Sequence, residues 1–308
     1  MTRGLITGRF CPPHLGHKQL IGTARRRVDM LTVAIDTRAN DAIAADLRMS
    51  WLKEIHPDCG IELTDNGQRA GADIVFGGDP SPAEYARVIG AKFFEIERAR
   101  ETEDLSSAAI LAAPLDNLQS LEPCVRAYFV KRVVLIGAES TGKTTLARHL
   151  AEHFDTLWVA EYGRENWEEK IRALTPDKPS VWWTREDFVH IAQEQQRREN
   201  EAARNANRVL ICDTNAFTTG TWFERYENRR DAEVDAIGAL DKADLYLIPT
   251  PDVPFVQDGV RDGEMIRDWM HCRFKERLTA GTVPFVELTG SFAERTRRAV
   301  DEVEKLLR

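Results

Sequence analysis

The feature that most constrains this chain is a glycine-rich segment set between a strand pattern and a helix pattern. Residues 137–144 read Gly-Ala-Glu-Ser-Thr-Gly-Lys-Thr and match the phosphate-binding pattern G-x-x-x-x-G-K-[ST]. Residues 132–136 before it read as a buried strand, and 145–151 after it have the apolar spacing of a helix. This context disfavours a chance match. The segment predicts a triphosphate site, because backbone N–H groups at a helix N-terminus bind phosphate.

Within this loop the residue types suggest separate roles. Lys143 is expected to reach the β- and γ-phosphates, and the Thr144 hydroxyl is expected to ligate Mg²⁺. The other residues predicted to cradle the triphosphate are Gly137, Glu139, Ser140, Thr141, Gly142 and Thr145.

Composition limits the classes of protein that remain. A chain of 308 residues with 43% apolar and 30% charged residues is typical of a soluble protein with two domains. The net charge of −8 argues against a general nucleic-acid binder and against an anionic membrane surface as partners. Five scattered cysteines without a C-x-x-C pair indicate neither a zinc site nor a disulfide framework, and they suit the cytoplasm. A homo-oligomer is left open.

Strand and helix patterns alternate through both halves of the chain, which predicts an α/β fold with two tandem parallel-sheet nucleotide-binding domains. The pattern weakens between Pro114 and Pro123, and the expected domains are 1–125 and 126–308. Helices are expected at 18–28, 45–55 and 82–88, and strands at 5–8, 31–35, 61–63, 74–76, 132–136, 157–160, 209–212 and 245–248.

A second candidate phosphate site follows the first strand. Residues 8–17 read Gly-Arg-Phe-Cys-Pro-Pro-His-Leu-Gly-His, so His14 and His17 share one face if both lie in the first helical turn. Gly8 and Gly16 allow a close approach of backbone to a ligand. Two imidazoles at a helix N-terminus can donate to phosphate oxygens, whereas either histidine alone would be explained as a cap or a surface residue.

This string resembles the H-x-G-H signature of the nucleotidyltransferases. Fused ahead of a phosphate-loop kinase, it is similar to the NadR-type bifunctional proteins, which pair a nicotinamide mononucleotide adenylyltransferase with a ribosylnicotinamide kinase. The resemblance covers essentially the whole chain, including the strings at 45–52, 127–133, 160–165, 211–219 and 257–261. It implies a Rossmann-like first domain, with ATP contacts from Gly8, Arg9, Phe10, Gly16, Arg100 and Ser106.

The first domain departs from the family at its second signature, I-S-x-T-x-I-R. The matching stretch 105–111 keeps Ser106, but Ala108 and Leu111 stand where threonine and arginine belong. Leucine supplies no charged donor to a phosphate, so we expect a slower adenylyl transfer unless a nearby arginine such as Arg100 takes this role.

Acidic side chains end two of the expected strands in the second domain. Glu161 is the candidate general base for a sugar hydroxyl, and Asp213 resembles the carboxylate that holds magnesium. The alternative for each is a cap on the next helix. Arg261 matches the family string in a lid segment and is the candidate catalytic cation, ahead of Arg267 and Arg273.

Flat cationic rings bind well to aromatic faces. The candidates for binding the acceptor are Tyr162, Arg164, Trp182, Trp183 and Trp222, although packing explains most tryptophans in proteins.

The resemblance implies an enzyme of NAD biosynthesis that uses ATP and Mg²⁺. It would phosphorylate nicotinamide riboside and then transfer an adenylyl group to nicotinamide mononucleotide. Three alternatives stay open: a kinase with a degenerate first domain that only binds or regulates, a non-catalytic nucleotide sensor, and a kinase for another nucleoside.

Overall fold

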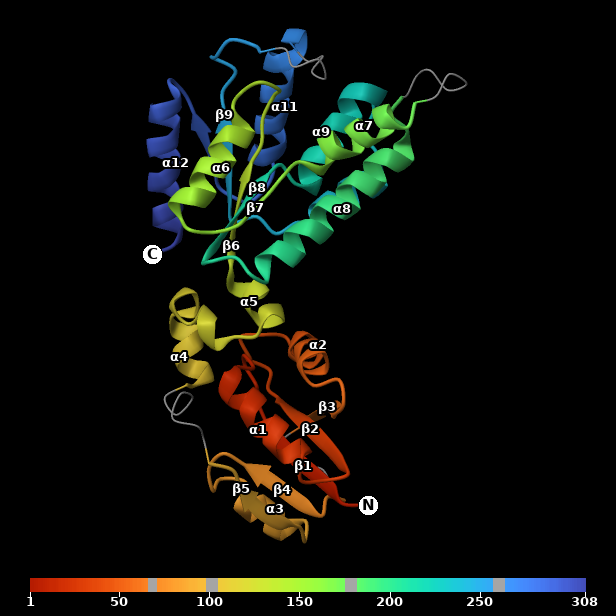
Figure 1. Ribbon diagram of the computed structural model, residues 1–308, viewed down its shortest axis with the longest axis vertical. Coiled ribbons are helices and arrows are strands. Elements are labelled where there is room, and N and C mark those ends of the chain that lie inside the picture. Colours follow the sequence, from red (N-terminus) through yellow and green to blue (C-terminus); the bar gives the residue numbers. More distant parts are fainter. Residues whose placement is uncertain (66–70, 98–104, 175–181, 257–263) are drawn as a thin grey trace. The chain divides into compact units, whose positions relative to one another are not determined.

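The computed structural model describes residues 1–65, 71–97, 105–174, 182–256 and 264–308. The chain forms two compact units, Met1–Phe129 and Val130–Arg308. Each unit is built on its own five-stranded sheet, and every strand pair in the described part of the chain is parallel. The α/β architecture with two tandem parallel sheets that the sequence predicts is therefore confirmed (Figure 1).

In the first unit the strand order is β3-β2-β1-β4-β5. Ile6 in β1 lies beside Val33 in β2 and beside Phe76 in β4, and all three are buried. Ile21 and Ala24 of the first helix pack on the same core. The strands are β1 (Arg3–Gly8), β2 (Met30–Thr37), β3 (Gly60–Asp65), β4 (Ile74–Gly77) and β5 (Lys92–Glu95). The helices are α1 (Leu15–Arg25), α2 (Ala45–Ile55), α3 (Ala83–Val88), α4 (Ser107–Ala112) and α5 (Pro123–Phe129).

In the second unit the order is β10-β9-β6-β8-β7. Val133 and Leu135 of β6 share a core with Leu146 and Leu150 of α6 and Val303 of α12, so these two helices cover one face of the sheet (Figure 1). The strands are β6 (Lys131–Leu135), β7 (Trp158–Val159), β8 (Val209–Asp213), β9 (Leu245–Pro249) and β10 (Phe285–Leu288). The helices are α6 (Lys143–His153), α7 (Tyr162–Arg172), α8 (Arg185–Ala203), α9 (Ala216–Glu227), α10 (Ala232–Ala239), α11 (Arg267–Thr279) and α12 (Phe292–Leu306).

The sequence patterns did not predict β5, β10 or α5. All four residues of β5 and three of the four residues of β10 are at least partly exposed to solvent, so neither strand shows the long buried apolar run of a central strand. The segment after Pro114 contains two single 3₁₀ turns, Pro114–Asp116 and Leu118–Ser120, and then α5. Within the described residues, no helix has both the length and the apolar character needed to cross a bilayer.

In both sheets the first strand of the unit lies in the middle, with later strands on either side. The chain reverses its winding direction at β1 and at β6, and in open parallel sheets ligands bind outside the carboxyl ends of the strands at this point. The two candidate phosphate sites follow these two strands. Topology therefore places each of them where its sheet offers a crevice.

Candidate active sites

The backbone of the phosphate loop requires its glycines. Gly137 and Gly142 have φ of +146° and +86°, which residues with a Cβ rarely adopt. A Cβ on Gly137 would also lie 3.3 Å from the Pro249 carbonyl oxygen, whereas Gly142 has open space around it. Conformation alone thus selects glycine at 142, and conformation and space together select it at 137.

Side chains fix the inside of this loop. The Lys143 Nζ and the Thr141 hydroxyl each donate to the Ala138 carbonyl oxygen at 2.9 Å. Lys143 is 8% exposed, so its ammonium lies inside the loop rather than in bulk water. This position holds a cation close to the N–H groups that would bind the phosphates.

A threonine and an aspartate meet beside the loop. The Thr144 hydroxyl donates to Asp213 Oδ2 at 2.5 Å, and Asp213 is 1% exposed. Its Oδ1 is buried and accepts no hydrogen bond from any residue that the structure describes. A buried carboxylate oxygen whose lone pairs accept no hydrogen bond, next to a hydroxyl group, suits a hard cation such as Mg²⁺, which takes oxygen ligands and keeps several waters. The described residues hold no cluster of three or more His, Cys, Asp or Glu side chains, so such an ion would need ligands from substrate or water.

Glu161 lies at the N-cap of α7, directly after the β7 segment, but its side chain does not cap the helix. Burial raises the pKa of its carboxyl from 4.5 to about 7, while the positive charge of Lys143 opposes this shift and the carboxylate of Asp213 adds to it. Burial likewise raises the pKa of Asp213, again opposed by Lys143. A carboxylate with a pKa near neutrality is suited to accept a proton at physiological pH.

One cavity of about 1160 Å³ joins these groups to an aromatic wall. The rings of Trp167 and Trp183 stack at 4.9 Å with 29° between their planes, and Trp182 is 78% exposed at the rim. The Trp222 Nε1 is buried and has no hydrogen-bond partner among the described residues. The cavity is lined by Glu139, Ser140, Thr141, Gly142, Lys143, Thr144, Thr145, Glu161, Arg164, Trp167, Trp182, Trp183, Asp213, Trp222 and Tyr226, among others.

One predicted acceptor residue lies elsewhere. Tyr162 does not line the cavity: its hydroxyl pairs with His190 Nε2 at 2.9 Å, and Arg198 lies 4.3 Å over its ring. As the first residue of α7, it turns into the contact between α7 and α8. Sequence reasoning missed Trp167, which sits five residues further along the same helix, and Tyr226, four residues after Trp222. Helical spacing from the predicted residues would have indicated Tyr226.

Of the arginines predicted for the lid, the structure describes Arg267 and Arg273, and neither of them lines the cavity. Arg261 lies outside the described residues. Arg273 forms ion pairs with Glu224 and Glu276 on the helical surface, away from the cavity lining. Arg267 is buried and donates to the Val253 carbonyl oxygen at 2.8 Å.

The first unit has a smaller cavity of about 250 Å³ beside the H-x-G-H string. The rings of His14 and His17 have their centroids 3.8 Å apart. Nδ1 of His14 accepts the Gly16 N–H at 3.2 Å, and Nδ1 of His17 accepts the His14 N–H at 3.3 Å. This capping box at the start of α1 assigns the proton of each neutral ring to Nε2. Predicted residues that line this cavity are Gly8, Phe10, His14, Gly16, His17 and Ser106.

The sequence also pointed to Ser106, Leu111, Arg9 and Arg100 at this site. Ser106 caps α4 by accepting the Ala109 N–H at 3.1 Å. Leu111 is half-buried and does not line the cavity. Arg9 is also not part of the lining, because its guanidinium pairs with Asp41. Arg100 lies outside the described residues.

Asp41 is held from a second side by Arg48. This arginine is fully buried, and its Nη2 donates to Asp41 Oδ2 at 2.7 Å. Its Nη1 donates to the carbonyl oxygens of Arg9 and Asp36. The ion pair thus ties the start of the H-x-G-H string to the end of β2.

Fold and sites together define a tandem α/β nucleotide-binding protein with a phosphate-loop site in its second unit. The family described as "AAA domain" matches residues 132–295, and the chain belongs to this family. The chain is also homologous to the NadR proteins. It is 26% identical over 349 aligned residues to the "Trifunctional NAD biosynthesis/regulator protein NadR" of Escherichia coli, with 99% of this chain and 83% of that protein covered.

Solved structures agree with this fold at lower identity. A "NadR protein in complex with NR" superposes with a TM-score of 0.77 at 20% identity, covering 99% of this chain and 95% of that one. A "NadR protein in complex with NAD and AMP-PNP" gives a TM-score of 0.74 at 20% identity, covering 99% and 96%. The tandem arrangement of the two α/β units is thus a known one.

Proposed function

We propose that this chain is a bifunctional enzyme that makes NAD from nicotinamide riboside in two ATP-dependent steps. The domain at 126–308 phosphorylates the riboside to the mononucleotide, and the domain at 1–125 transfers an adenylyl group to that product. The observation that carries the kinase assignment is the cavity of about 1160 Å³ in the second unit. It joins the phosphate loop, the carboxylates of Glu161 and Asp213, and the stacked rings of Trp167 and Trp183.

In the kinase step, Glu161 accepts the proton from the riboside 5′-hydroxyl as this oxygen attacks the γ-phosphorus of ATP. Lys143 and the N–H groups of the loop stabilise the charge on the phosphate oxygens. Thr144 and Asp213 would hold Mg²⁺, which neutralises phosphate charge when it is bound. Trp167 and Trp183 offer a flat, apolar face on which a cationic pyridinium ring stacks.

In the adenylyl transfer, a phosphate oxygen of nicotinamide mononucleotide attacks the α-phosphorus of ATP and pyrophosphate leaves. His14 and His17 donate from Nε2 to phosphate oxygens as negative charge increases there. No covalent enzyme intermediate is needed. Since the described lining of the cavity in this unit contains no tryptophan, the proposal rests here on the two histidines and on homology.

A nucleotide sensor would need the phosphate loop but not a base at its edge. The raised pKa of Glu161 and its place in the same cavity favour a phosphoryl transferase. We assign the enzyme to the cytoplasm, where cysteines such as the five of this chain stay reduced.

The test is a product analysis with the purified protein. Incubation with ATP, Mg²⁺ and nicotinamide riboside should give the mononucleotide and NAD, separated by chromatography. Lys143→Ala should stop riboside phosphorylation but still make NAD from supplied mononucleotide. Adding His17→Ala to that variant should end NAD formation. Mononucleotide without any NAD would leave only the kinase, and no phosphorylated riboside at all would refute the assignment.

A further inference from the structure

Two buried arginines hold the phosphate loop from the side away from the cavity. Arg295 of α12 is 3% exposed, and its Nη1 donates to the Thr141 carbonyl oxygen at 3.0 Å. Arg267, at the start of α11, donates to the Ser140 carbonyl oxygen at 3.4 Å. Neither arginine lines the cavity, whereas Ser140 and Thr141 do. The loop therefore lies between the cavity on one side and two guanidinium groups on the other.

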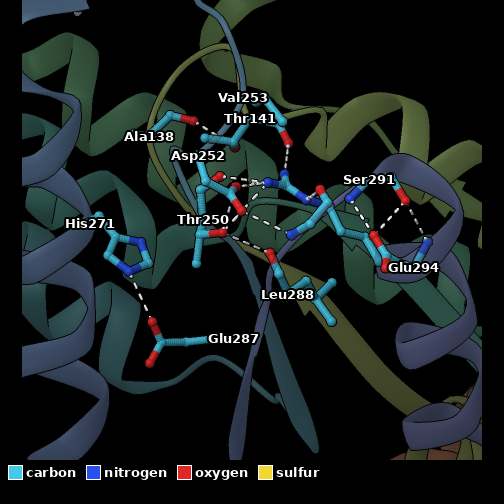
Figure 2. Close-up of polar contacts among 12 residues, drawn as sticks. Ala138, Thr141, Thr250, Asp252, Val253, His271, Glu287, Leu288, Ser291 and Glu294 are labelled. Carbon is cyan, nitrogen blue, oxygen red and sulfur yellow. Dashed lines mark hydrogen bonds and ion pairs between the residues drawn. The ribbon is translucent and has the colours of Figure 1, made fainter.

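Arg295 makes further contacts that join three loops. Its Nε donates to the Gly290 carbonyl oxygen at 2.9 Å, and its Nη2 donates to the Thr250 carbonyl oxygen at 3.1 Å. It also pairs with the carboxylate of Asp252. Figure 2 shows Thr141, Thr250 and Asp252 gathered around one point, although they come from the loops after β6 and β9. Gly290 belongs to the loop after β10, so one side chain connects three loops at the carboxyl edge of the sheet.

A trans peptide links the direction of a carbonyl to that of the next N–H. The C=O of one residue and the N–H of the next point in opposite directions across the planar unit. When Arg295 holds the Thr141 carbonyl, it turns the Gly142 N–H to the opposite side, which is the side of the cavity. The Ser140 carbonyl on Arg267 turns the Thr141 N–H in the same way. Gly142, at a φ of +86°, has no Cβ to restrict its backbone to this conformation, so contacts from outside the loop are needed to fix the direction of this peptide.

We propose that Arg295 is a positioning residue for the ATP site, which fixes the Gly142 N–H toward the phosphates and ties this peptide to the loops after β9 and β10. This inference rests on the proposed binding of ATP by the phosphate loop, but it does not depend on which acceptor the kinase uses. Lysine cannot replace Arg295, because one ammonium cannot reach the carbonyls of Thr141, Thr250 and Gly290 together.

The experiment compares Arg295→Lys with Arg298→Lys, one turn further along α12. The Arg298 side chain is 59% exposed and forms an ion pair with Glu302 on the same helix, so it is a matched control. Calorimetry gives the Kd of the non-hydrolysable analogue AMP-PNP with Mg²⁺ at the phosphate-loop site, identified as the binding event that Lys143→Ala removes, and, separately, the Kd of nicotinamide riboside. We expect Arg295→Lys to weaken AMP-PNP binding about 10- to 100-fold, the size of one lost charged hydrogen bond. Riboside binding should change less than about twofold, and the control should match the parent.

An effect of Arg295→Lys on AMP-PNP binding alone distinguishes a positioning role of Arg295 from a general loss of folded structure. Equal weakening of both ligands, or unchanged AMP-PNP binding in a folded Arg295→Lys protein, would overturn the proposal. If the parent binds AMP-PNP but no riboside, the proposed acceptor fails, and the effect of Arg295→Lys on AMP-PNP still decides the role of Arg295.

A second variant covers the case in which Arg295→Lys does not fold. The Asp252 side chain is 42% exposed, and Asp252→Asn removes the carboxylate that pairs with Arg295 while it keeps an amide oxygen as acceptor. Because Arg295 still donates to the carbonyls of Gly290, Thr141 and Thr250, this substitution weakens the hold on Arg295 without removing it. It should weaken AMP-PNP binding about two- to tenfold with riboside binding unchanged. Parental AMP-PNP affinity in Asp252→Asn would then reject the proposal.

Discussion

Replacing Glu161 by glutamine removes a proton acceptor but keeps the size of the side chain. Because the base must be ionised to accept a proton, its pKa of about 7 sets the pH at which the enzyme becomes active. The kcat/KM of the parent should fall about tenfold for each pH unit below 7, and it should level off above it. Glu161→Gln should lower kcat about 10²- to 10⁴-fold and remove this dependence on pH.

The same substitution should affect stability in the opposite direction. The rise from the ordinary pKa of 4.5 to about 7 means that ionised Glu161 lowers the free energy of unfolding by roughly 3 kcal/mol. The folded protein holds this proton more tightly than the unfolded chain, so stability falls between pH 4.5 and 7 and is then constant. Glutamine carries no charge. Glu161→Gln should therefore be more stable than the parent above pH 7, with the difference fading toward pH 4.5.

Both effects are measured on the same preparations. Initial rates of riboside phosphorylation between pH 5.5 and 8.5 give the activity profile, and scanning calorimetry at the same pH values gives the stability. Glu165→Gln, on the same helix but outside the cavity lining, is the control, and its rates should equal those of the parent. Parental turnover in Glu161→Gln would refute the reasoning and would move the base to Asp213. A flat pH profile in the parent would refute the role of burial.

Three further substitutions test the kinase site. Lys143→Ala should abolish riboside phosphorylation while circular dichroism shows an intact fold, because the ammonium donates to a carbonyl of its own loop, that of Ala138, and not to the core. Near-normal turnover would contradict the phosphate site. Asp213→Asn should raise the Mg²⁺ concentration that gives half-maximal rate, and an unchanged Mg²⁺ titration would remove Asp213 from the cation site. Trp222→Phe should raise the KM for the riboside about two- to tenfold by loss of an indole donor, with the KM for ATP unchanged; exposed Trp269→Phe is its control.

Local patterns were sufficient to predict the central strands and the phosphate loop. Val133, Val134 and Leu135 are fully buried, and successive side chains of a strand point to opposite faces of the sheet, so both faces of this strand are covered and its apolar run is visible in sequence. β5 and β10 lack that apolar run and were missed. The phosphate loop was predictable because its function needs specific residue types, such as Gly142 and Lys143, at fixed spacing.

Sequence patterns could not show which aromatic residues line the cavity. Tryptophan looks the same in a core and in a pocket, and Trp182, Trp183 and Trp222 were predicted while Trp167 was not. Tyr162, next to Glu161 in sequence, turns out to face α8 instead of the cavity. Successive residues of a helix point about 100° apart, so neighbours in sequence seldom share a site.

The sequence by itself determined the two candidate phosphate-binding strings and the alternating pattern that predicts parallel sheets, since both depend on short-range chemistry. Only the tertiary structure decided which distant groups meet: Thr144 with Asp213 across 69 positions, and Arg295 with Thr141 across 154. Such pairings follow from strand order, and strand order depends on the packing of all the helices on the sheet. The burial that raises the pKa of Glu161 has the same origin, because it comes from every segment that excludes water from the cavity.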